Sequence, residues 1–597
     1  MRRFVTTEDI RELAEVGEFE LMMREGTVLT DAALDEAHRL GVRLVEGSRL
    51  AAPRPAEVDR PSPGRQSRVP PPSRVPSPTV TPRDAAPAQA GPTQAAGPRF
   101  EGLPDPARMH PKLLIDGEFR DATGGATNRS VDPATNETIV EVASATTDDI
   151  DLAVGAARRA FREWRVLDPA ERADLLLKVA ERIEREHEFL AKVESQDVGR
   201  PIRETTLIDL PASWDPFRFF QGLVRAIDGR VLALPQDSLD YVRKEPMGVV
   251  GMIIPWNFPL HIACRKSAAA LAAGNTVVLK PPELAPLSSI ELGRICLEAG
   301  LPPGVFNVVP GAGEVAGQAL VEHRGVDKIA FTGSTVVGRG GMAGWGGAQK
   351  GVCLELGGKK TSSLLSGADL ERAVSGALFG IYLAQGQVCS AGSRILVERS
   401  VYDEFVERFA ARAAAIRIGL PWRWRTQLGP LVNERQMERV YEYVEIGQAE
   451  GATVLGGGTP PDDPELARGN FIRPTAFVNV EPGFRIAQEE IFGPVAVVMP
   501  FSGEEEAVRL ANDVRYGLAA GIWTTDVGRA HRVARDLEAG SIWVNHFGVY
   551  PSEAPFGGYK ESGTGHDLGL ESLHEYMETK NVHVNIGRGF NDWYEDN

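Results

Sequence analysis

The stretch MGVVGMIIPWNFPLHIACRKSAAALAAGNTVVLKPPE, residues 247–283, carries two strand patterns on either side of a helix pattern. Residues 249–254 are a short run rich in Val and Ile, which predicts a buried strand. Residues 261–273 predict a helix that ends at Gly274, and 276–279 predict the next strand. Because strands joined by a helix in so short a segment lie parallel, this stretch predicts one β-α-β unit.

The same alternation continues along the chain as far as Gly333. The further expected elements are helices over 286–299 and 313–321 and strands over 305–309 and 328–331. Helical patterns also precede it, over 146–164 and 169–198, and a second β/α-rich region begins near residue 360. Repeated β-α-β units predict an α/β fold, with a parallel sheet covered by helices on both faces and a nucleotide site at its carboxyl edge.

Composition excludes several classes of function. The chain has 597 residues, with 65 Lys and Arg against 82 Asp and Glu, a formal charge of −17. Nucleic-acid binding depends on clustered basic residues, so we expect no nucleic-acid partner. The N-terminus MRRFVTTEDI lacks the apolar stretch of a secretion signal, and we find no run of the length that spans a bilayer. We expect a cytoplasmic protein.

The four cysteines predict neither a disulfide framework nor a metal site, because none belongs to a C-x-x-C pair. Cys389 lies in the loop Gly386-Gln387-Val388-Cys389-Ser390-Ala391-Gly392, where an exposed thiol could act as a nucleophile. Cys264, Cys296 and Cys353 lie in helix or strand patterns and are expected to pack in the core.

Two polar residues are candidates for catalysis. Glu355 lies between two leucines, so burial would raise its pKa toward that of a general base; the alternative is a structural Glu bonded to backbone amides. Asn257 follows the strand 249–254 and could donate a hydrogen bond to an oxyanion; the alternative is a turn residue beside Pro.

The candidate nucleotide contacts follow other strands. The turn Gly333-Ser334-Thr335-Val336-Val337-Gly338 can present N–H groups to a pyrophosphate, although such a turn alone is more often a helix cap. Lys280 and Glu283 follow the strand 276–279 and could bind ribose hydroxyls, or form only a surface ion pair. The charge of Glu283 would disfavour a 2′-phosphate, so NAD is preferred over NADP.

Taken together and in order, these motifs resemble the aldehyde dehydrogenase superfamily. The resemblance spans about residues 106–587. The motifs that carry it are Pro255–Pro259, Lys280–Glu283, Gly333–Gly338, Glu355–Lys359, Gly386–Cys389, Glu490–Pro494, Asn512 with Tyr516–Leu518, and Pro555–Gly563.

The resemblance implies a role for each matching residue. Cys389 would attack an aldehyde, Asn257 and the Cys389 N–H would hold the oxyanion, Glu355 would activate water, and Lys266 would tune protonation. The implied cofactor contacts are Trp256, Ser334, Gly333 and Gly338 at the pyrophosphate side, Lys280 and Glu283 at the adenosine ribose, and Glu490 and Phe492 at the nicotinamide ribose and ring.

The resemblance also bears on the product and the substrate. Members that transfer the acyl group to coenzyme A generally lack a carboxylate at the place of Glu355, so we expect a free acid. Ser390 and Asn545-His546-Phe547 resemble members that act on amino- or trimethylammonio-aldehydes. His566-Asp567 departs from the Arg-Glu frequent in the family, which puts substrate-loop or subunit contacts there in doubt.

The expected domains follow from the family architecture. Residues 106–227 and 247–357 would form the Rossmann-type NAD-binding domain, and 358–576 the catalytic domain. Residues 228–246 and 577–587 would supply strands that join subunits into a homodimer or homotetramer.

The N-terminal part has a different composition. Residues 51–99 hold 13 of the 42 prolines and no aromatic residue, so we predict a disordered linker over 51–105. Residues 1–50 predict a short module, with helices capped by Thr6 and Thr30 and a strand over 42–45. The module resembles tags that direct enzymes into bacterial microcompartments, which would make shell proteins its partners; the alternative is an accessory domain packed on the enzyme.

Overall fold

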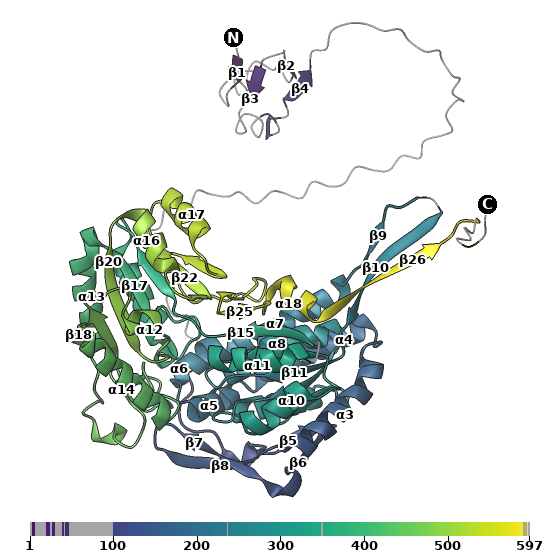
Figure 1. Cartoon of the computed structure of the whole chain (residues 1–597), viewed down its shortest axis with the longest axis horizontal. Coiled ribbons are helices and arrows are strands. Elements are labelled where there is room, and N and C mark those ends of the chain that lie inside the picture. The colour runs from purple at the N-terminus through teal and green to yellow at the C-terminus, as the bar shows by residue number, and fades with distance from the viewer. Residues whose placement is uncertain are drawn as a thin grey trace, which may run out of the picture. The chain divides into compact units, whose positions relative to one another are not determined.

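The computed structural model describes residues 3–5, 20–23, 27–29, 37, 39–40, 42–46, 99–235, 237–347, 350–588 and 594. The chain forms two compact units, Met1–Gly91 and Pro92–Asn597. Figure 1 shows the labelled elements of both. Of the linker predicted over 51–105, residues 51–98 lie outside the described residues. Within the described part, Phe100 packs against a hydrophobic core, and the Gly102 N–H donates to the Trp422 carbonyl over 3.1 Å.

The larger unit contains an eight-stranded sheet in the order β25-β15-β14-β11-β12-β13-β5-β6. Its centre consists of parallel strands: β11 (Val249–Ile253), β12 (Thr276–Lys280), β13 (Phe306–Val308), β14 (Lys328–Thr332) and β15 (Gly351–Glu355). The antiparallel strands β5 (Leu113–Ile115), β6 (Glu118–Arg120) and β25 (Gly563–Thr564) complete the edges. The α/β fold predicted from the alternating pattern is confirmed.

Helices cover both faces of this sheet because alternate strand residues point to opposite sides. Val250 and Met252 pack in one core with α4 (Pro169–Arg185), α7 (Leu210–Leu223), α8 (Pro259–Ala273) and α9 (Leu287–Glu298). Val249 packs in another core with α3 (Thr147–Trp164) and α10 (Gln318–Glu322). The helix α11 (Thr335–Gly347) follows β14.

Two helix predictions need correction. The helix expected over 169–198 is broken at Glu186 into α4 and α5 (His187–Val198). The helix expected over 313–321 begins as a π-helical segment, Gly313–Gly317, and only then becomes α10. In both places the apolar period continues across the break, so the sequence pattern alone does not reveal it.

The second sheet has seven strands in the order β18-β19-β20-β17-β16-β22-β23. They are β16 (Thr361–Leu364), β17 (Arg394–Glu398), β18 (Thr453–Gly456), β19 (Thr475–Val478), β20 (Val495–Phe501), β22 (Ala519–Trp523) and β23 (Ser541–Val544). Its helices include α12 (Leu370–Tyr382), α13 (Tyr402–Ala414), α14 (Glu434–Ala449), α16 (Gly503–Asn512) and α17 (Val527–Asp536).

A three-stranded sheet stands apart from these two. The strand β10 (Ser238–Pro246) pairs along its full length with β26 (Met577–Asn585) and on its other edge with β9 (Arg230–Leu232). Figure 1 shows β10 and β26 side by side, extending away from the two larger sheets. The sequence predicted strands in both segments.

The smaller unit contains two parallel strand pairs. The strand β1 (Arg3–Val5) pairs with β3 (Thr27–Leu29), and β2 (Glu20–Met23) with β4 (Arg43–Glu46). The strand predicted over 42–45 corresponds to β4, whereas the other three were not predicted. The helix expected after Thr6 lies outside the described residues, and of the helix expected after Thr30 only residues 37, 39 and 40 are described, in helical form.

No helix in the described part of the chain combines the length and apolar character needed to cross a bilayer.

Candidate active site

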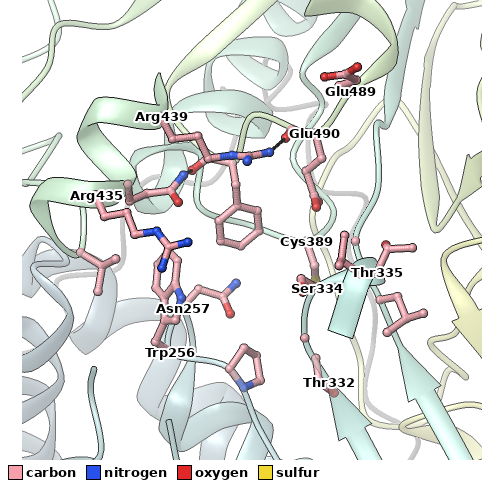
Figure 2. A pocket seen from close by; sticks show the side chains of 18 of the residues that line it. Trp256, Asn257, Thr332, Ser334, Thr335, Cys389, Arg435, Arg439, Glu489 and Glu490 are labelled. Carbon is pink, nitrogen blue, oxygen red and sulfur yellow. Dashed lines mark hydrogen bonds between the residues drawn. The ribbon is translucent and has the colours of Figure 1, made fainter. Parts of the chain in front are cut away.

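The carboxyl edge of the eight-stranded sheet borders a cavity of about 890 Å³. Figure 2 shows the side chains of Trp256, Asn257, Ser334 and Cys389 pointing into one opening. Of the residues predicted from the sequence, the cavity wall contains Trp256, Asn257, Gly333, Ser334, Glu355, Cys389, Glu490 and Phe492. Predicted residues separated by more than 200 positions therefore lie around one site.

Cys389 follows a tight turn after α12. Ala384, Gln385 and Gly386 have consecutive positive φ angles of 49°, 57° and 71°. The first two are left-handed residues with a side chain, a conformation that costs free energy and persists only where surrounding contacts enforce it. The Gln385 Nε2 group provides one such contact by donating to the Gly199 carbonyl over 2.8 Å. The turn thus fixes the position of the thiol.

Asn257 connects the end of β11 to the same turn. Its Nδ2 group donates to the Gln387 carbonyl over 2.8 Å, and the side chain is buried. Gln387 is held in turn, because its Oε1 accepts a hydrogen bond from the Val432 N–H over 3.1 Å. The amide of Asn257 is therefore a fixed donor beside the thiol, rather than only a turn residue beside proline.

Glu355 is the last residue of β15 and is 2% exposed. Neither carboxyl oxygen has a hydrogen-bond partner among the described residues. Burial, reinforced by the nearby negative charge of Asp567, raises the pKa of the Glu355 carboxyl well above its ordinary value. The expected alternative, a structural Glu bonded to backbone amides, does not describe this side chain.

Lys266 lies behind the site in a buried ion pair. Its Nζ is 3.0 Å from Asp567 Oδ1, and Arg265 Nε is 2.9 Å from Asp567 Oδ2. Although burial alone would raise it, the pKa of the Asp567 carboxyl is lowered, because Lys266 and Arg265 stabilise its charge. From the sequence, Asp567 was only a departure from a family pattern. The structure shows that its carboxylate forms an ion pair with Lys266.

Another buried cation stands near the thiol. Burial raises the pKa of the Cys389 thiol, and the charges of Lys360 and then Arg265 oppose that shift. Lys360 is 1% exposed, and its Nζ is 3.8 Å from Glu490 Oε1. The same carboxylate oxygen accepts a hydrogen bond from the Gly358 N–H over 2.7 Å. Lys360 is not among the residues predicted for the site, because a Lys-Lys pair after two glycines carries no distinctive sequence signal.

The turn after β14 meets the cavity through the start of α11. Ser334 both lines the cavity and caps the helix, since its Oγ accepts a hydrogen bond from the Val337 N–H over 3.3 Å. The cap interpretation and the ligand interpretation are thus compatible. Gly338 is buried away from the cavity lining, and a Cβ there would lie 2.5 Å from Leu356, so this glycine serves close helix packing.

Aromatic and polar groups from the segment after β11, from α14 and from the segment before β20 also line the cavity. Trp256 and Phe492 meet edge to face with centroids 5.3 Å apart. Arg439 of α14 donates to the Glu490 carbonyl over 2.8 Å, and Gln436 Nε2 donates to the Phe492 carbonyl over 2.9 Å. Figure 2 shows the Arg439 contact as a dashed line. Neither residue of α14 is among those predicted for the site, because both lie outside the recognised motifs.

Lys280 and Glu283 do not belong to this wall. Lys280 is buried at the end of β12, and burial lowers its pKa to about 8 against the opposing charge of Glu283. The Glu283 side chain is exposed, and its backbone carbonyl accepts a hydrogen bond from Asn128 Nδ2 over 3.2 Å. The structure leaves these two residues near the sheet edge but outside the lining of the large cavity.

A parallel-sheet edge with a capped helix start, next to a thiol, an amide and a buried carboxyl, defines a nucleotide-dependent enzyme that acts on a carbonyl group. The size of the cavity, within the roughly 300–1,000 Å³ usual for cofactor sites, and its aromatic and carboxylate lining fit a dinucleotide.

The chain belongs to the aldehyde dehydrogenase family, whose sequence profile matches residues 119–582. It is 46% identical over 477 residues to DhaS of Bacillus subtilis (strain 168), a match that covers 80% of this chain and 96% of DhaS. Among solved structures, PnpE in complex with nicotinamide adenine dinucleotide is 44% identical with a TM-score of 0.80, covering 81% of this chain and 100% of that one.

The NAD⁺ complex of an aldehyde dehydrogenase from Bacillus cereus is similar to the same degree, with 44% identity, a TM-score of 0.80, and coverage of 82% of this chain and 100% of that one. The protein is therefore an NAD(P)-dependent aldehyde dehydrogenase.

Proposed function

We propose that this enzyme oxidises an aldehyde to a free carboxylic acid, with NAD as the preferred cofactor and Cys389 as the nucleophile. The observation that carries the proposal is Glu355, a buried carboxyl without a hydrogen-bond partner among the described residues, on the wall of the cavity that also contains Cys389. A group placed there can take a proton from water and direct it at an acyl group on the sulfur.

The first step belongs to Cys389 and Asn257. The thiolate forms a bond to the carbonyl carbon, and the carbonyl oxygen becomes an oxyanion. The Asn257 amide and the Cys389 backbone N–H can donate to that oxygen, and loss of one such donor typically lowers the rate about 10²–10³-fold. Lys360 and Arg265 favour the thiolate because their charges oppose the effect of burial on the Cys389 pKa.

When bound, the cofactor would accept the hydride that leaves the aldehyde carbon, so that the acyl group remains on Cys389 as a thioester. Trp256 and Phe492 would flank its nicotinamide end, Glu490 would hold the ribose, and Ser334 with Gly333 would face the pyrophosphate, since all five residues line the same cavity.

The last step belongs to Glu355. Its carboxylate accepts a proton from water as the water oxygen adds to the thioester carbon. The carbon–sulfur bond then breaks, the acid leaves, and Cys389 is regenerated. The Lys266–Asp567 pair acts as a positioning pair behind Glu355, because both charges influence its pKa.

Purified protein incubated with NAD and a panel of aldehydes tests the proposal. We expect reduced cofactor and an equal amount of free acid from the wild type, and neither from Cys389→Ala. The alternative of an acylating enzyme would be supported if coenzyme A gave acyl-CoA faster than acid forms without it. A catalytically weak scaffold protein would show no reduced cofactor in either variant.

The cofactor preference is tested separately. The carboxylate of Glu283 beyond β12 would repel a 2′-phosphate, so kcat/KM should be higher with NAD than with NADP. Glu283→Gln should narrow that ratio. If the ratio of kcat/KM with NAD to that with NADP did not change, Glu283 would not be the cause of the preference for NAD.

We also propose that the enzyme is a homodimer or homotetramer joined through the β9-β10-β26 sheet. β26 forms one edge of that sheet, and most of its residues are exposed. An open edge of nine residues is a template for pairing with another chain. Light scattering should give an oligomer for the wild type and a smaller species after Val582→Pro, which removes a backbone donor from β26.

Finally, we propose that residues 1–50 direct this enzyme, in the cytoplasm, into the lumen of a protein-shelled microcompartment. The sequence pattern of this segment supports the proposal, together with its place before the part of the chain that matches the family.

A further inference from the structure

A second, smaller cavity of about 70 Å³ also reaches Cys389. Its wall is largely aromatic and aliphatic, with side chains from the residue before α8, from α12 and the turn after it, and from the segment after β23: Phe258, Phe379, Leu383, Val388, Phe547 and Phe556. Such a wall accepts the apolar body of a short substrate whose carbonyl reaches the thiol. If the proposed oxidation is correct, this cavity is where the aldehyde binds.

A cationic side chain interrupts this apolar wall. Arg265 lines the cavity, is 5% exposed at its side chain, and lies with its guanidinium 5.2 Å from the centre of the Phe556 ring. Its Nη2 is buried and finds no hydrogen-bond acceptor in the part of the chain that the structure describes. Leaving a buried charged donor without an acceptor is unfavourable, so the site is incomplete without an acceptor from elsewhere.

Asp567 does not fully balance the local charge. It faces both Arg265, at 2.9 Å from Nε, and Lys266, at 3.0 Å from Nζ. Burial and the charge of Asp567 both raise the pKa of the neighbouring carboxyl, Glu355, which disfavours its charged form. Two cations therefore share one carboxylate, which leaves a positive excess beside the cavity.

The other polar groups of the wall do not remove this excess. The Asp209 carboxylate is 2.8 Å from Arg200 Nη1, and its pKa is raised by burial. His261 Nδ1 is 2.8 Å from the Ala212 carbonyl, and burial lowers the pKa of that imidazole to about 3, which keeps it neutral. The Ser390 and Tyr550 hydroxyls are hydrogen-bonded to each other.

We infer that the substrate is a short aldehyde that carries a carboxylate, and that Arg265 binds this carboxylate within the cavity that ends at Cys389. The inference rests on the proposed function and narrows its substrate class. The product is a dicarboxylate: the aldehyde carbon loses its hydrogen as hydride to NAD⁺ and gains an oxygen from water. The same charge disfavours the amino- and trimethylammonio-aldehydes that Ser390 and the 545–547 segment suggested from sequence.

The test compares three aldehydes with the full-length enzyme and NAD: 4-oxobutanoate, butanal of the same carbon count, and trimethylammonioacetaldehyde. We expect kcat/KM for 4-oxobutanoate to exceed that for butanal by about 10- to 100-fold, the range of a charge-assisted hydrogen bond. Arg265→Met should lower activity on both aldehydes, because a charge that favours the Cys389 thiolate is lost. It should abolish most of the ratio between them, because only 4-oxobutanoate also loses the partner of its carboxylate. Arg265→Lys should keep part of the ratio.

A matched control separates recognition from packing. Phe379→Leu alters the same wall without altering charge, so it should change kcat/KM for 4-oxobutanoate and butanal by similar factors. If Arg265 serves only to pair with Asp567, Arg265→Met would lower thermal stability and leave the substrate ratio unchanged, which would overturn the inference.

The remaining outcomes are distinct. A wild type that oxidises butanal or the trimethylammonio substrate as well as 4-oxobutanoate overturns the inference and leaves the proposed oxidation intact. A wild type that forms no NADH with any aldehyde overturns the proposed function itself.

Discussion

At the residue scale, Glu355 should separate the two halves of the reaction. Its carboxyl is needed to activate water but not for attack by the thiol. Glu355→Gln should therefore release a first equivalent of NADH per active site in a rapid burst. Steady-state turnover should fall about 10²–10⁴-fold, because general-base catalysis of hydrolysis is lost. Stopped-flow absorbance at the NADH band measures both phases.

Cys389→Ala is the control for this experiment, since it should abolish the burst as well as turnover. If Glu355→Gln lost the burst too, the residue would have to act before hydride transfer, as the base that deprotonates the thiol.

The raised pKa of Glu355 also predicts a pH dependence. The base must be ionised to act, and a raised pKa means that its ionised fraction grows over a higher pH range than that of an ordinary glutamate. The steady-state kcat should therefore increase with pH. Asp567 is a neighbouring negative charge that raises the pKa of Glu355. In Asp567→Asn, the increase of kcat with pH should therefore occur at lower pH. If kcat of Asp567→Asn rose over the same pH range as that of the wild type, and circular dichroism showed that the variant is folded, this coupling would be contradicted.

Lys360 provides a prediction for the thiol itself. Lys360 is the cation that most strongly opposes the effect of burial on the Cys389 pKa, so Lys360→Met should raise that pKa further. The pH midpoint for alkylation of Cys389 by iodoacetamide should move upward. The adjacent Lys359 is also buried, with a pKa lowered to about 7 by burial, whereas the cations that most strongly oppose the shift of the Cys389 pKa are Lys360 and Arg265. Lys359→Met is therefore the matched control. Equal shifts in both variants would assign the effect to general loss of structure.

These residues mark what sequence could and could not predict about the site. Asn257 follows a strand, Glu355 ends a strand and Cys389 follows a helix, each in a recognisable motif, and all three line one cavity. Arg265 and Asp567 carried no such signal, because their pairing joins positions about 300 residues apart in sequence and depends on how α8 packs against the C-terminal segment. A buried ion pair has no local pattern that sequence reasoning can detect.

At the scale of elements, the pairing of β25 with β15 determines where Glu355 lies. Gly563 is opposite Glu355 in this antiparallel pair and has φ +135°. A Cβ at Gly563 would lie 1.9 Å from the Leu354 carbonyl oxygen, so Gly563→Ala must push the strands β25 and β15 apart. We expect a loss of stability of about 1–3 kcal/mol. Turnover should also fall, since the carboxyl moves with its strand. Thermal unfolding and steady-state kinetics measure the two effects.

Gly340 is the contrasting position. It lies in α11 and is exposed, and a Cβ added there would meet no heavy atom within 4 Å. Gly340→Ala should leave activity in place and stabilise the helix by about 0.5–1 kcal/mol, because alanine has the higher helix propensity. Similar damage from both substitutions would mean that the β25–β15 contact has no special importance.

The elements differ in how far sequence predicts them. Apolar runs separated by helices predicted β11 to β14 within a residue or two, because strands buried on both faces must be continuously apolar. Short strands such as β1 and β3 were missed, since three residues are too few for a period to be recognised. Breaks within α4–α5 and before α10 arise from packing, which a local pattern does not contain.

At the scale of the whole molecule, the two compact units predict that catalysis is independent of the N-terminal one. The family profile begins at residue 119, and every group assigned to the reaction lies in the unit Pro92–Asn597. Deletion of residues 1–99 should therefore leave kcat/KM within about twofold, whereas association with co-expressed microcompartment shell proteins should be lost. Co-purification with shell proteins and aldehyde-dependent NADH formation measure the two properties in the same preparations.

The reciprocal fusion is the control for this deletion. Residues 1–99 fused to a fluorescent protein should direct that protein to the shells. The tag hypothesis predicts this because it assigns the whole targeting signal to this segment and none to the catalytic unit. If the truncated enzyme is insoluble or inactive, the N-terminal unit instead supports the fold, as an accessory domain would. If the full-length and the truncated enzyme bind shells equally, the targeting signal lies in the catalytic unit. The exposed face of the β9-β10-β26 sheet would then be the next segment to alter.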